Sequence, residues 1–337
     1  MYIKTNDYAE EGVPLHATNL DLEERWTALT PKQMTEWMGD NFKWFYGIKS
    51  NRATKLHLVY DLVEDRPAIA KTVLYRPDDL ASPQAVATRR KVLIEQIRIL
   101  NDLSSPLLPE PLDWFQTRNT VDGLDPSLQD SEPVLILDYQ PGQPLDRYIG
   151  KMRFSKDDNV HRPRIARLAL KLLEFLRVLD ENGYGYLDMN LQHILLLKND
   201  IPRFVGLGSI CPVNERGYLD STHINFWSTS KGYAAPELLD ATNDWENAKK
   251  ATPAQVGAFS LGVVIHQMFA EKKDFERAWL HKGSFLYPNG ETEEIIQSQH
   301  MGDLIHELIT DLCQHDPAKR LTDFDEIEDR LVAIENS

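Results

Sequence analysis

The sequence predicts an α+β fold with a small antiparallel β lobe that contains one helix and a larger lobe that is helical. Three observations predict this division. Alternating apolar segments run through residues 41–139, a single helical pattern interrupts them, and the apolar residues after Gly142 recur mostly at helical spacing. We therefore expect three parts, namely an N-terminal extension (1–40), a β-rich lobe (41–139) and a helical lobe (140–337).

Composition limits the class of protein. Hydrophobic residues make up 42% of the 337 residues and charged residues 26%, which is ordinary for a soluble globular protein. The net charge of -15 argues against a nucleic-acid backbone as the main partner. Because Cys211 and Cys313 are the only cysteines, we expect no disulfide framework and a reducing compartment.

No pattern in the sequence indicates export or membrane insertion. The opening residues lack the charged and then apolar pattern of a secretory signal, and no apolar run approaches the roughly 18 to 20 residues that a membrane span needs. We expect a cytoplasmic protein whose partner is another protein of open identity, with neither nucleic acid nor membrane as a partner.

The first elements lie in and just after the acidic extension. Thr30, followed by a proline, favours a short helix that ends near Met38. The β-rich lobe follows, and its apolar segments are bounded by turn-forming residues. Strands are expected at residues 43–48, 55–62, 67–75 and 133–139.

One helix is expected inside the β-rich lobe. Ser82 is a suitable cap, Pro83 suits the first helical position, and the pattern continues to about Leu103. The apolar residues Val86, Leu93, Ile97 and Leu100 would form its buried face. The polar residues 117–133 predict a surface loop between two strands.

Two strong helices are expected in the helical lobe. The first covers residues 162–182 and should end at Gly183, because glycine favours the backbone conformation that closes a helix. The second begins at Thr252 and Pro253, with Gln255 placed to complete a capping box. Because its following residues are nearly all apolar, this helix should lie in the centre of the lobe.

Six segments within residues 42–332 resemble motifs of the protein kinase superfamily. They are AIAK (68–71), LILDYQPGQPL (135–145), YLDMNLQHILLL (186–197), GYAAPELL (232–239), FSLGVVIHQMF (259–269) and DPAKRLT (316–322). Each segment alone is a weak signal, but together they share the order and spacing of a Ser/Thr protein kinase. The resemblance implies the bilobal protein kinase-like fold.

The resemblance assigns roles to four residues. Asp188 matches the catalytic base, and Lys71 matches the strand lysine that holds the ATP phosphates. Glu237 and Arg320 match a pair that fastens the activation segment to the large lobe. We therefore take Asp188 as the catalytic candidate and Lys71 as the cofactor-binding candidate.

The two metal ligands of the family are missing. Gly206-Leu207-Gly208 stands where the family has Asp-Phe-Gly, so no carboxylate is available there. His193 stands where the family has a metal-binding Asn, and Mg²⁺ prefers oxygen ligands to an imidazole. We expect no metal site, and we expect His193 to be a hydrogen-bonded loop residue rather than a ligand.

Other catalytic positions are also replaced. Tyr186 and Leu187 stand where the family has the His and Arg of the catalytic loop, and Asn190 replaces the lysine that steadies the transferred phosphate. Gly257 replaces an Asp that anchors the loop in the family. The family's Asp is missing at Gly257 and its Arg is missing at Leu187. These two losses match each other, because the Asp and the Arg belong to one network in the family.

The nucleotide pocket shows the same trend. The expected phosphate loop at residues 46–55 contains only Gly47, and the side chains of Lys49, Asn51 and Arg52 would crowd the space that three glycines leave open. In the helix of the β-rich lobe, Gln96 occupies the register of the Glu that pairs with the strand lysine, and Glu95 precedes it.

These observations favour a catalytically inactive kinase-like protein, a pseudokinase that acts as a binding scaffold or allosteric regulator without Mg-ATP. The alternative is an active Ser/Thr kinase or other ATP-dependent transferase that uses Asp188 and Lys71 with a non-standard metal site. A third hypothesis is nucleotide binding without transfer. We expect no cofactor, and ATP bound without the usual Mg²⁺ stays open. Structural roles compete with these, because Asp188 can hydrogen-bond its own loop and Lys71 can pair with Glu95.

Overall fold

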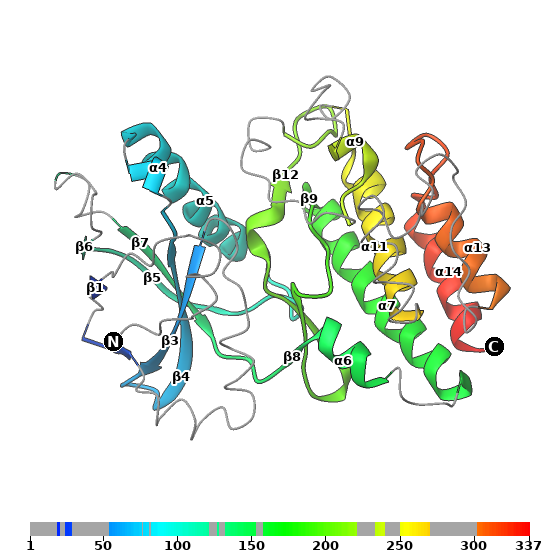
Figure 1. Ribbon diagram of the computed structural model, residues 1–337, viewed down its shortest axis with the longest axis horizontal. Helices are drawn as coiled ribbons and strands as arrows, with labels where there is room; N and C mark the ends of the chain where they lie inside the picture. Colours follow the sequence, from blue (N-terminus) through cyan, green and yellow to red (C-terminus); the bar gives the residue numbers. More distant parts are fainter. Residues whose placement is uncertain are drawn as a thin grey trace. The chain divides into compact units, whose positions relative to one another are not determined.

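The computed structural model divides the chain into two compact units, residues 1–142 and 143–337 (Figure 1). The described residues are 19–20, 24–28, 54–75, 77–80, 82–120, 127, 132–152, 158–220, 233–239, 250–269 and 302–337. The first unit contains an antiparallel sheet with helices, and the second is mainly helical, which confirms the predicted α+β fold class. Along the described residues, no helix is both long and apolar enough to cross a membrane.

A five-stranded antiparallel sheet forms the first unit. Its strands lie in the order β2 (Trp26–Ala28), β3 (Thr54–Asp61), β4 (Arg66–Val73), β7 (Glu132–Asp138) and β5 (Pro111–Thr117). One face of the sheet packs into an apolar core that includes Val59, Ala70, Phe115 and Ile136. A separate two-stranded sheet pairs β1 (Asn19–Leu20) with β6 (Asn119–Thr120).

Strand β2 comes from the segment that the sequence assigned to the extension. It pairs with the end of β3, and Trp26 is 3% exposed in the core while its indole N–H donates to Asp113 at 3.2 Å. Burial of this large ring stabilises the three-residue strand, whose polar surroundings gave no strand pattern. The expected helix at 31–38, the strand at 43–48 and the phosphate loop with Gly47, Lys49, Asn51 and Arg52 lie outside the described residues, and the extension boundary stays a prediction.

Helix α5 (Pro83–Asp102) confirms the predicted helix of the first unit, and the short α4 (Pro77–Leu80) precedes it. The Ser82 hydroxyl accepts the Ala85 backbone N–H at 3.3 Å, as expected for the cap. The predicted apolar face is buried, and α5 packs against β4, β5 and β7 (Figure 1).

The turn between β3 and β4 is fixed by the carboxylate of Asp61. Arg25 donates to it through two nitrogens, at 2.9 and 2.6 Å, and the backbone N–H groups of Val63 and Glu64 donate to the same side chain. These donors, led by Arg25, lower the pKa of Asp61 to about 2.

The second unit combines short strands with a helical layer. Its two small sheets have the orders β11-β10-β8 and β12-β9. The strands are β8 (Gln143–Pro144), β9 (Tyr184–Tyr186), β10 (Ile194–Leu196), β11 (Pro202–Phe204) and β12 (Ile210–Pro212). The helices are α6 (Leu145–Met152), α7 (Asp158–Glu181), α9 (Pro236–Leu239), α11 (Pro253–Phe269), α13 (Asp303–Leu312) and α14 (Phe324–Glu335), with 3₁₀ turns at Lys198–Asp200 and Leu207–Ser209.

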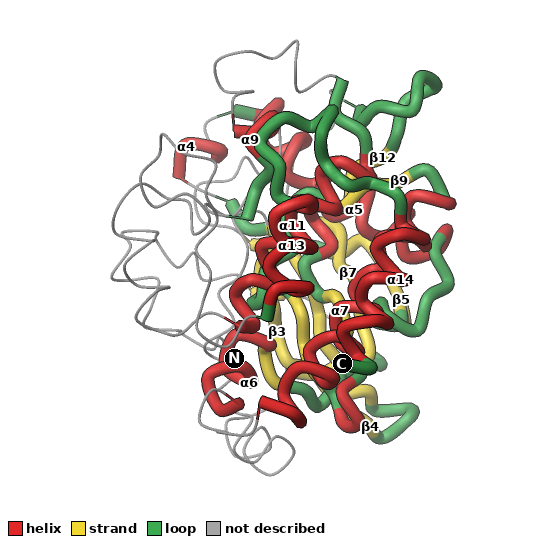
Figure 2. The backbone as a smooth tube through the Cα atoms, turned by 90° about the vertical axis from the view of Figure 1, so that its right-hand side faces the viewer, coloured by secondary structure: helices red, strands yellow, loops and turns green. Residues whose placement is uncertain are grey.

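Helices α7 and α11 confirm the two helices that the sequence predicts for this unit. Helix α7 begins four residues earlier than expected, includes Pro163 and ends at Glu181, two residues before the predicted terminator Gly183, whose φ is 74°. At the start of α11, Gln255 and Thr252 exchange side-chain-to-backbone hydrogen bonds, which is the predicted capping box. Figure 2 shows α7 beside both α11 and α14, and α11 is buried along its length.

Candidate functional site

A tight turn between β9 and β10 carries the catalytic candidate Asp188. The Asn190 carboxamide oxygen accepts the backbone N–H groups of Gln192 at 2.9 Å and His193 at 3.1 Å, and so sets the shape of the turn. Asp188 is 1% exposed, and its backbone carbonyl accepts from the Asn190 side chain at 3.4 Å. Asn190 therefore has a structural task at the position where the family has a lysine.

The His193 imidazole lies against Asp188. Its Nδ1 atom is 3.1 Å from the Asp188 carbonyl oxygen, 3.5 Å from the carboxylate Oδ2 and 3.0 Å from the Asn190 side-chain nitrogen. The ring is thus held by polar groups of its own loop, which agrees with the expectation of a hydrogen-bonded loop residue.

Gly206 lies directly under this ring. The backbone N–H of Val205 donates to the His193 carbonyl at 2.9 Å, which brings the two segments together. A Cβ atom at position 206 would stand 2.5 Å from the His193 Cγ and 2.6 Å from its Nδ1, closer than real contacts allow. Because φ of Gly206 is -82°, the backbone itself would accept any residue, and the obstacle is the imidazole.

These residues do not fit a magnesium ion held in the manner of the family. Mg²⁺ needs nearly octahedral oxygen ligands, whereas position 206 has no side chain and position 193 offers nitrogen. The space in which a carboxylate at position 206 would begin is filled by the ring of His193. Across the part of the chain that the structure describes, no three His, Cys, Asp or Glu side chains gather in a way that could hold a metal ion.

Aromatic and aliphatic packing occupies the other replaced positions. Tyr186 is fully buried and meets Phe175 and Phe204 edge to face, at 5.5 and 5.7 Å between ring centroids. Burial, with a smaller effect of Asp188, raises the pKa of Tyr186 well above its usual range. Gly257 faces Leu176, whose Cδ2 would be 3.0 Å from a Cβ at that position.

Lys71 lies on β4 in the first unit and is 2% exposed. Among the described residues, no carboxylate lies within ion-pair distance of its amine, and burial lowers the pKa of Lys71 to about 8. The pair with Glu95 that the sequence allowed is not formed, because Glu95 bonds to Arg98 at 3.0 Å. Gln96 is 1% exposed, and neither of its amide atoms has a hydrogen-bond partner.

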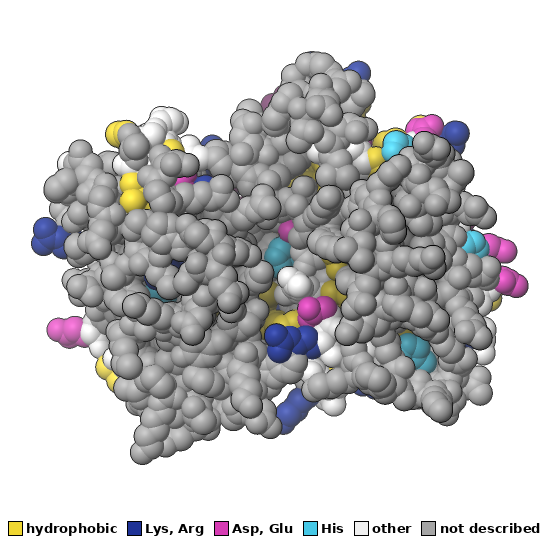
Figure 3. All heavy atoms as spheres, viewed as in Figure 1, with side chains coloured by type: hydrophobic (Ala, Val, Ile, Leu, Met, Phe, Trp, Pro, Cys, Tyr) yellow, Lys and Arg dark blue, Asp and Glu magenta, His cyan; other side chains and the backbone are white. Residues whose placement is uncertain are grey.

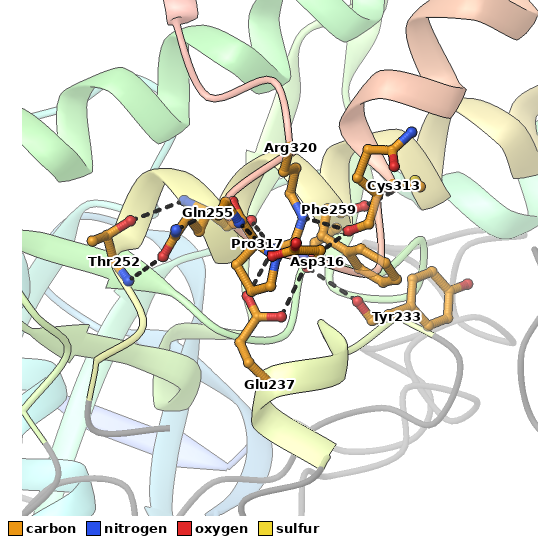
Figure 4. A network of polar contacts seen from close by, with 12 residues as sticks. Tyr233, Glu237, Thr252, Gln255, Phe259, Cys313, Asp316, Pro317 and Arg320 are labelled. Carbon is orange, nitrogen blue, oxygen red and sulfur yellow. Dashed lines mark hydrogen bonds and ion pairs between the residues drawn. The ribbon is translucent and has the colours of Figure 1, made fainter. Parts of the chain in front are cut away.

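The predicted pair of Glu237 and Arg320 is confirmed. The Arg320 guanidinium donates to both carboxylate oxygens, at 2.7 and 3.1 Å, and also to the backbone carbonyls of Gln255 and Gln314 (Figure 4). It lies over the Phe259 ring, 5.0 Å from the centroid. This buried network joins α9, the start of α11 and the turn after α13, so the role of the pair is architectural.

The structure brings together Asp188, Asn190, His193 and Gly206 in the second unit, whereas Lys71 belongs to the first. Sequence reasoning identified each of these positions but missed that His193 fills the space above Gly206. The sequence did contain a signal for this contact. Both metal-ligand positions of the family are changed together, to a large ring at position 193 and to a residue without a side chain at position 206.

Comparison with known proteins agrees with this geometry. Residues 77–331 match the family model for the protein kinase domain. A region of 131 residues is 27% identical to developmentally-regulated protein kinase 1 of Dictyostelium discoideum, covering 34% of this chain and 16% of that protein. The chain thus matches about a sixth of that relative's length. With the match to the domain model over most of its residues, the chain belongs to the protein kinase family.

Proposed function

We propose that this protein is a pseudokinase, a kinase-fold protein that binds and regulates a protein partner and does not transfer phosphate from Mg-ATP. One observation carries the proposal, namely that the His193 ring fills the space directly above Gly206. Phosphoryl transfer depends on metal ions that neutralise the phosphate charge, and both side chains that hold them in the family are replaced here.

The remaining groups around Asp188 support the same proposal. Asp188 is buried and held in a network with Asn190 and His193, and Leu187, at the position of the family's arginine, is 1% exposed. The Asn190 side chain is bonded to groups of its own loop and Leu187 has no polar side-chain atom, so both stabilise the loop and neither replaces the family's cationic side chains. The loop is therefore built for stability.

The test is thermal unfolding of the full chain with ATP, with and without Mg²⁺ or Mn²⁺. A ligand at one hundred times its Kd stabilises a protein by about 2.7 kcal/mol, which shifts Tm by several degrees in a chain of this size. We expect no metal-dependent shift for the wild type. A metal-dependent shift in the wild type would overturn the proposal.

The double variant His193→Asn with Gly206→Asp extends this test, because it clears the ring and restores both family ligands. A metal-dependent shift in the double variant alone would show that the two positions control metal binding. His193→Asn alone is the matched control, since it opens the space without supplying a carboxylate. No shift in any variant would indicate that the pocket is closed elsewhere.

A second candidate function is binding of a phosphorylated ligand without metal, and the unpaired state of Lys71 favours it. A buried amine without a carboxylate is costly, and an anionic ligand would relieve that cost. An active transferase that uses Asp188 and Lys71 is the remaining alternative. ATP that stabilises the chain equally with and without metal supports metal-free binding, whereas phosphate transfer that Asp188→Asn abolishes supports the transferase.

The partner belongs to the proposal as well. The net charge of -15 favours a partner with a basic face, although side chains of both signs reach the surface on the face drawn in Figure 3. An association of this kind should weaken as salt is raised from about 0.05 to 0.5 M. A cytoplasmic location would place the protein beside such partners.

A further inference from the structure

A buried group of three polar side chains joins α5 to the sheet. Tyr75 lies two residues beyond β4, Arg90 lies on α5 and Glu132 is the first residue of β7. The Tyr75 hydroxyl donates to the Glu132 carboxylate, 2.7 and 2.8 Å from its two oxygens, and the Arg90 Nε donates to the Tyr75 hydroxyl at 3.0 Å. The Arg90 guanidinium also pairs directly with Glu132.

These three side chains are withdrawn from water. Tyr75 is 3% exposed and Glu132 is 1% exposed, and the Arg90 side chain is 11% exposed. Burial raises the pKa of Glu132, and the bonds from Tyr75 and Arg90 act in the opposite direction. Removing one member of such a network takes hydrogen bonds away from the two buried groups that remain. Each member therefore stabilises the position of α5 against the sheet.

The residues that would hold the helix in a kinase do not do so here. Lys71 has no carboxylate partner among the described residues, and Gln96, in the register of the family's Glu, has neither amide atom bonded. Glu95 is turned to Arg98 on its own helix. The polar contact that joins α5 to the sheet therefore lies at Arg90, nearly two turns earlier along the helix than Gln96, whereas Arg89 pairs with Asp79 of α4.

We propose that the Tyr75–Arg90–Glu132 triad fixes the position of α5, so that this position depends neither on Lys71 nor on a ligand at Lys71. The helix then keeps this position without prior nucleotide binding. The proposal concerns the first unit alone, and its test contains no nucleotide, so its failure is distinguishable from failure of the proposed function.

The test is hydrogen exchange of the full chain, followed by mass spectrometry on peptides from α5. Glu132→Gln keeps the shape of the side chain but presents an amide to the Arg90 donors. Exchange in α5 should rise about tenfold or more, the ratio that corresponds to about 1.4 kcal/mol of local opening. Peptides from α14, in the other unit, should be unchanged.

Lys71→Met is the matched control, because it removes the residue that would hold α5 in a kinase. Exchange in α5 should be no faster than in the wild type. The proposal is overturned if Lys71→Met speeds exchange in α5, or if Glu132→Gln leaves it unchanged. If Glu132→Gln does not fold, Tyr75→Phe serves in its place, since it deletes one hydroxyl, and it should raise exchange in α5 by a smaller ratio with the other unit unchanged.

Discussion

Lys71 shows how far the environment of one residue can depart from its role in the family. Burial without a counter-ion makes the charged form of the Lys71 amine less stable than the neutral form, and this lowers its pKa to about 8. The same residue in an active kinase is stabilised by a carboxylate and by phosphates. In this chain, no described residue places a carboxylate beside Lys71, so its positive charge opposes folding.

Replacing Lys71 with Met should therefore stabilise the protein at pH 7. The fall of its pKa from 10.5 to about 8 sets an upper limit of about 3 kcal/mol for this gain. The cost of the wild-type lysine is fully present below pH 8 and disappears as the pH rises through 10.5, so the difference between the two proteins should shrink over that range. Urea unfolding at pH 7 and pH 10 measures it, and a destabilised Lys71→Met would show that the amine has a partner.

Among the elements, the helices were the most predictable from sequence. The Ser82 cap of α5 and the Thr252–Gln255 box of α11 are local patterns, and local hydrogen bonds form them. Strand β2 was not predictable, because it has three residues and its stability comes from burial of Trp26 in a sheet formed by distant segments.

The site was predictable by position but not by contact. The sequence identified Gly206, His193 and the pair of Glu237 and Arg320 because each stands at a recognisable place in a motif. It did not reveal the ring of His193 over Gly206, since that contact depends on the approach of two loops that are apart in sequence. The triad around Glu132 was hidden for the same reason.

The network around α9 and α11 supplies a prediction for an element. Glu237→Ala would leave the Arg320 side chain, which is 0% exposed, without its counter-ion, and should cost about 3–5 kcal/mol of unfolding free energy. Arg330→Ala is the control, because its pair with Asp311 is partly exposed and should cost less than about 1 kcal/mol. Equal losses in urea unfolding would contradict an architectural role for Glu237.

At the scale of the whole molecule, acid should destabilise the first unit through two of its titratable groups, His57 and Asp61. In the first unit, burial, with a smaller effect from the charge of Lys55, lowers the pKa of His57 to about 3. Neutral His57 is therefore favoured in the folded state, and its stabilising contribution is present above pH 6.5 and is lost as the pH falls towards 3. The pKa of Asp61, about 2, produces a loss only below about pH 4.

We therefore expect the first unit to lose up to about 3 kcal/mol between pH 6.5 and pH 4 through His57. His57→Gln should remove this loss, because the amide can keep the bond to the Thr72 hydroxyl, 3.1 Å away, without titrating. Hydrogen exchange at several pH values, read separately for peptides of each unit, measures the effect. A wild type and a variant with the same pH dependence would show that His57 titrates freely.

The close approach of His193 and Gly206 also constrains how such a site can arise by mutation. With an aspartate at position 206, a histidine at 193 would meet the first carbon of that side chain at 2.5 Å, so the combination is sterically disfavoured. A carboxylate at position 206 therefore fits only once the imidazole at position 193 has been replaced or has turned away. Restoring a carboxylate at position 206 thus requires a change at position 193 as well as the substitution itself.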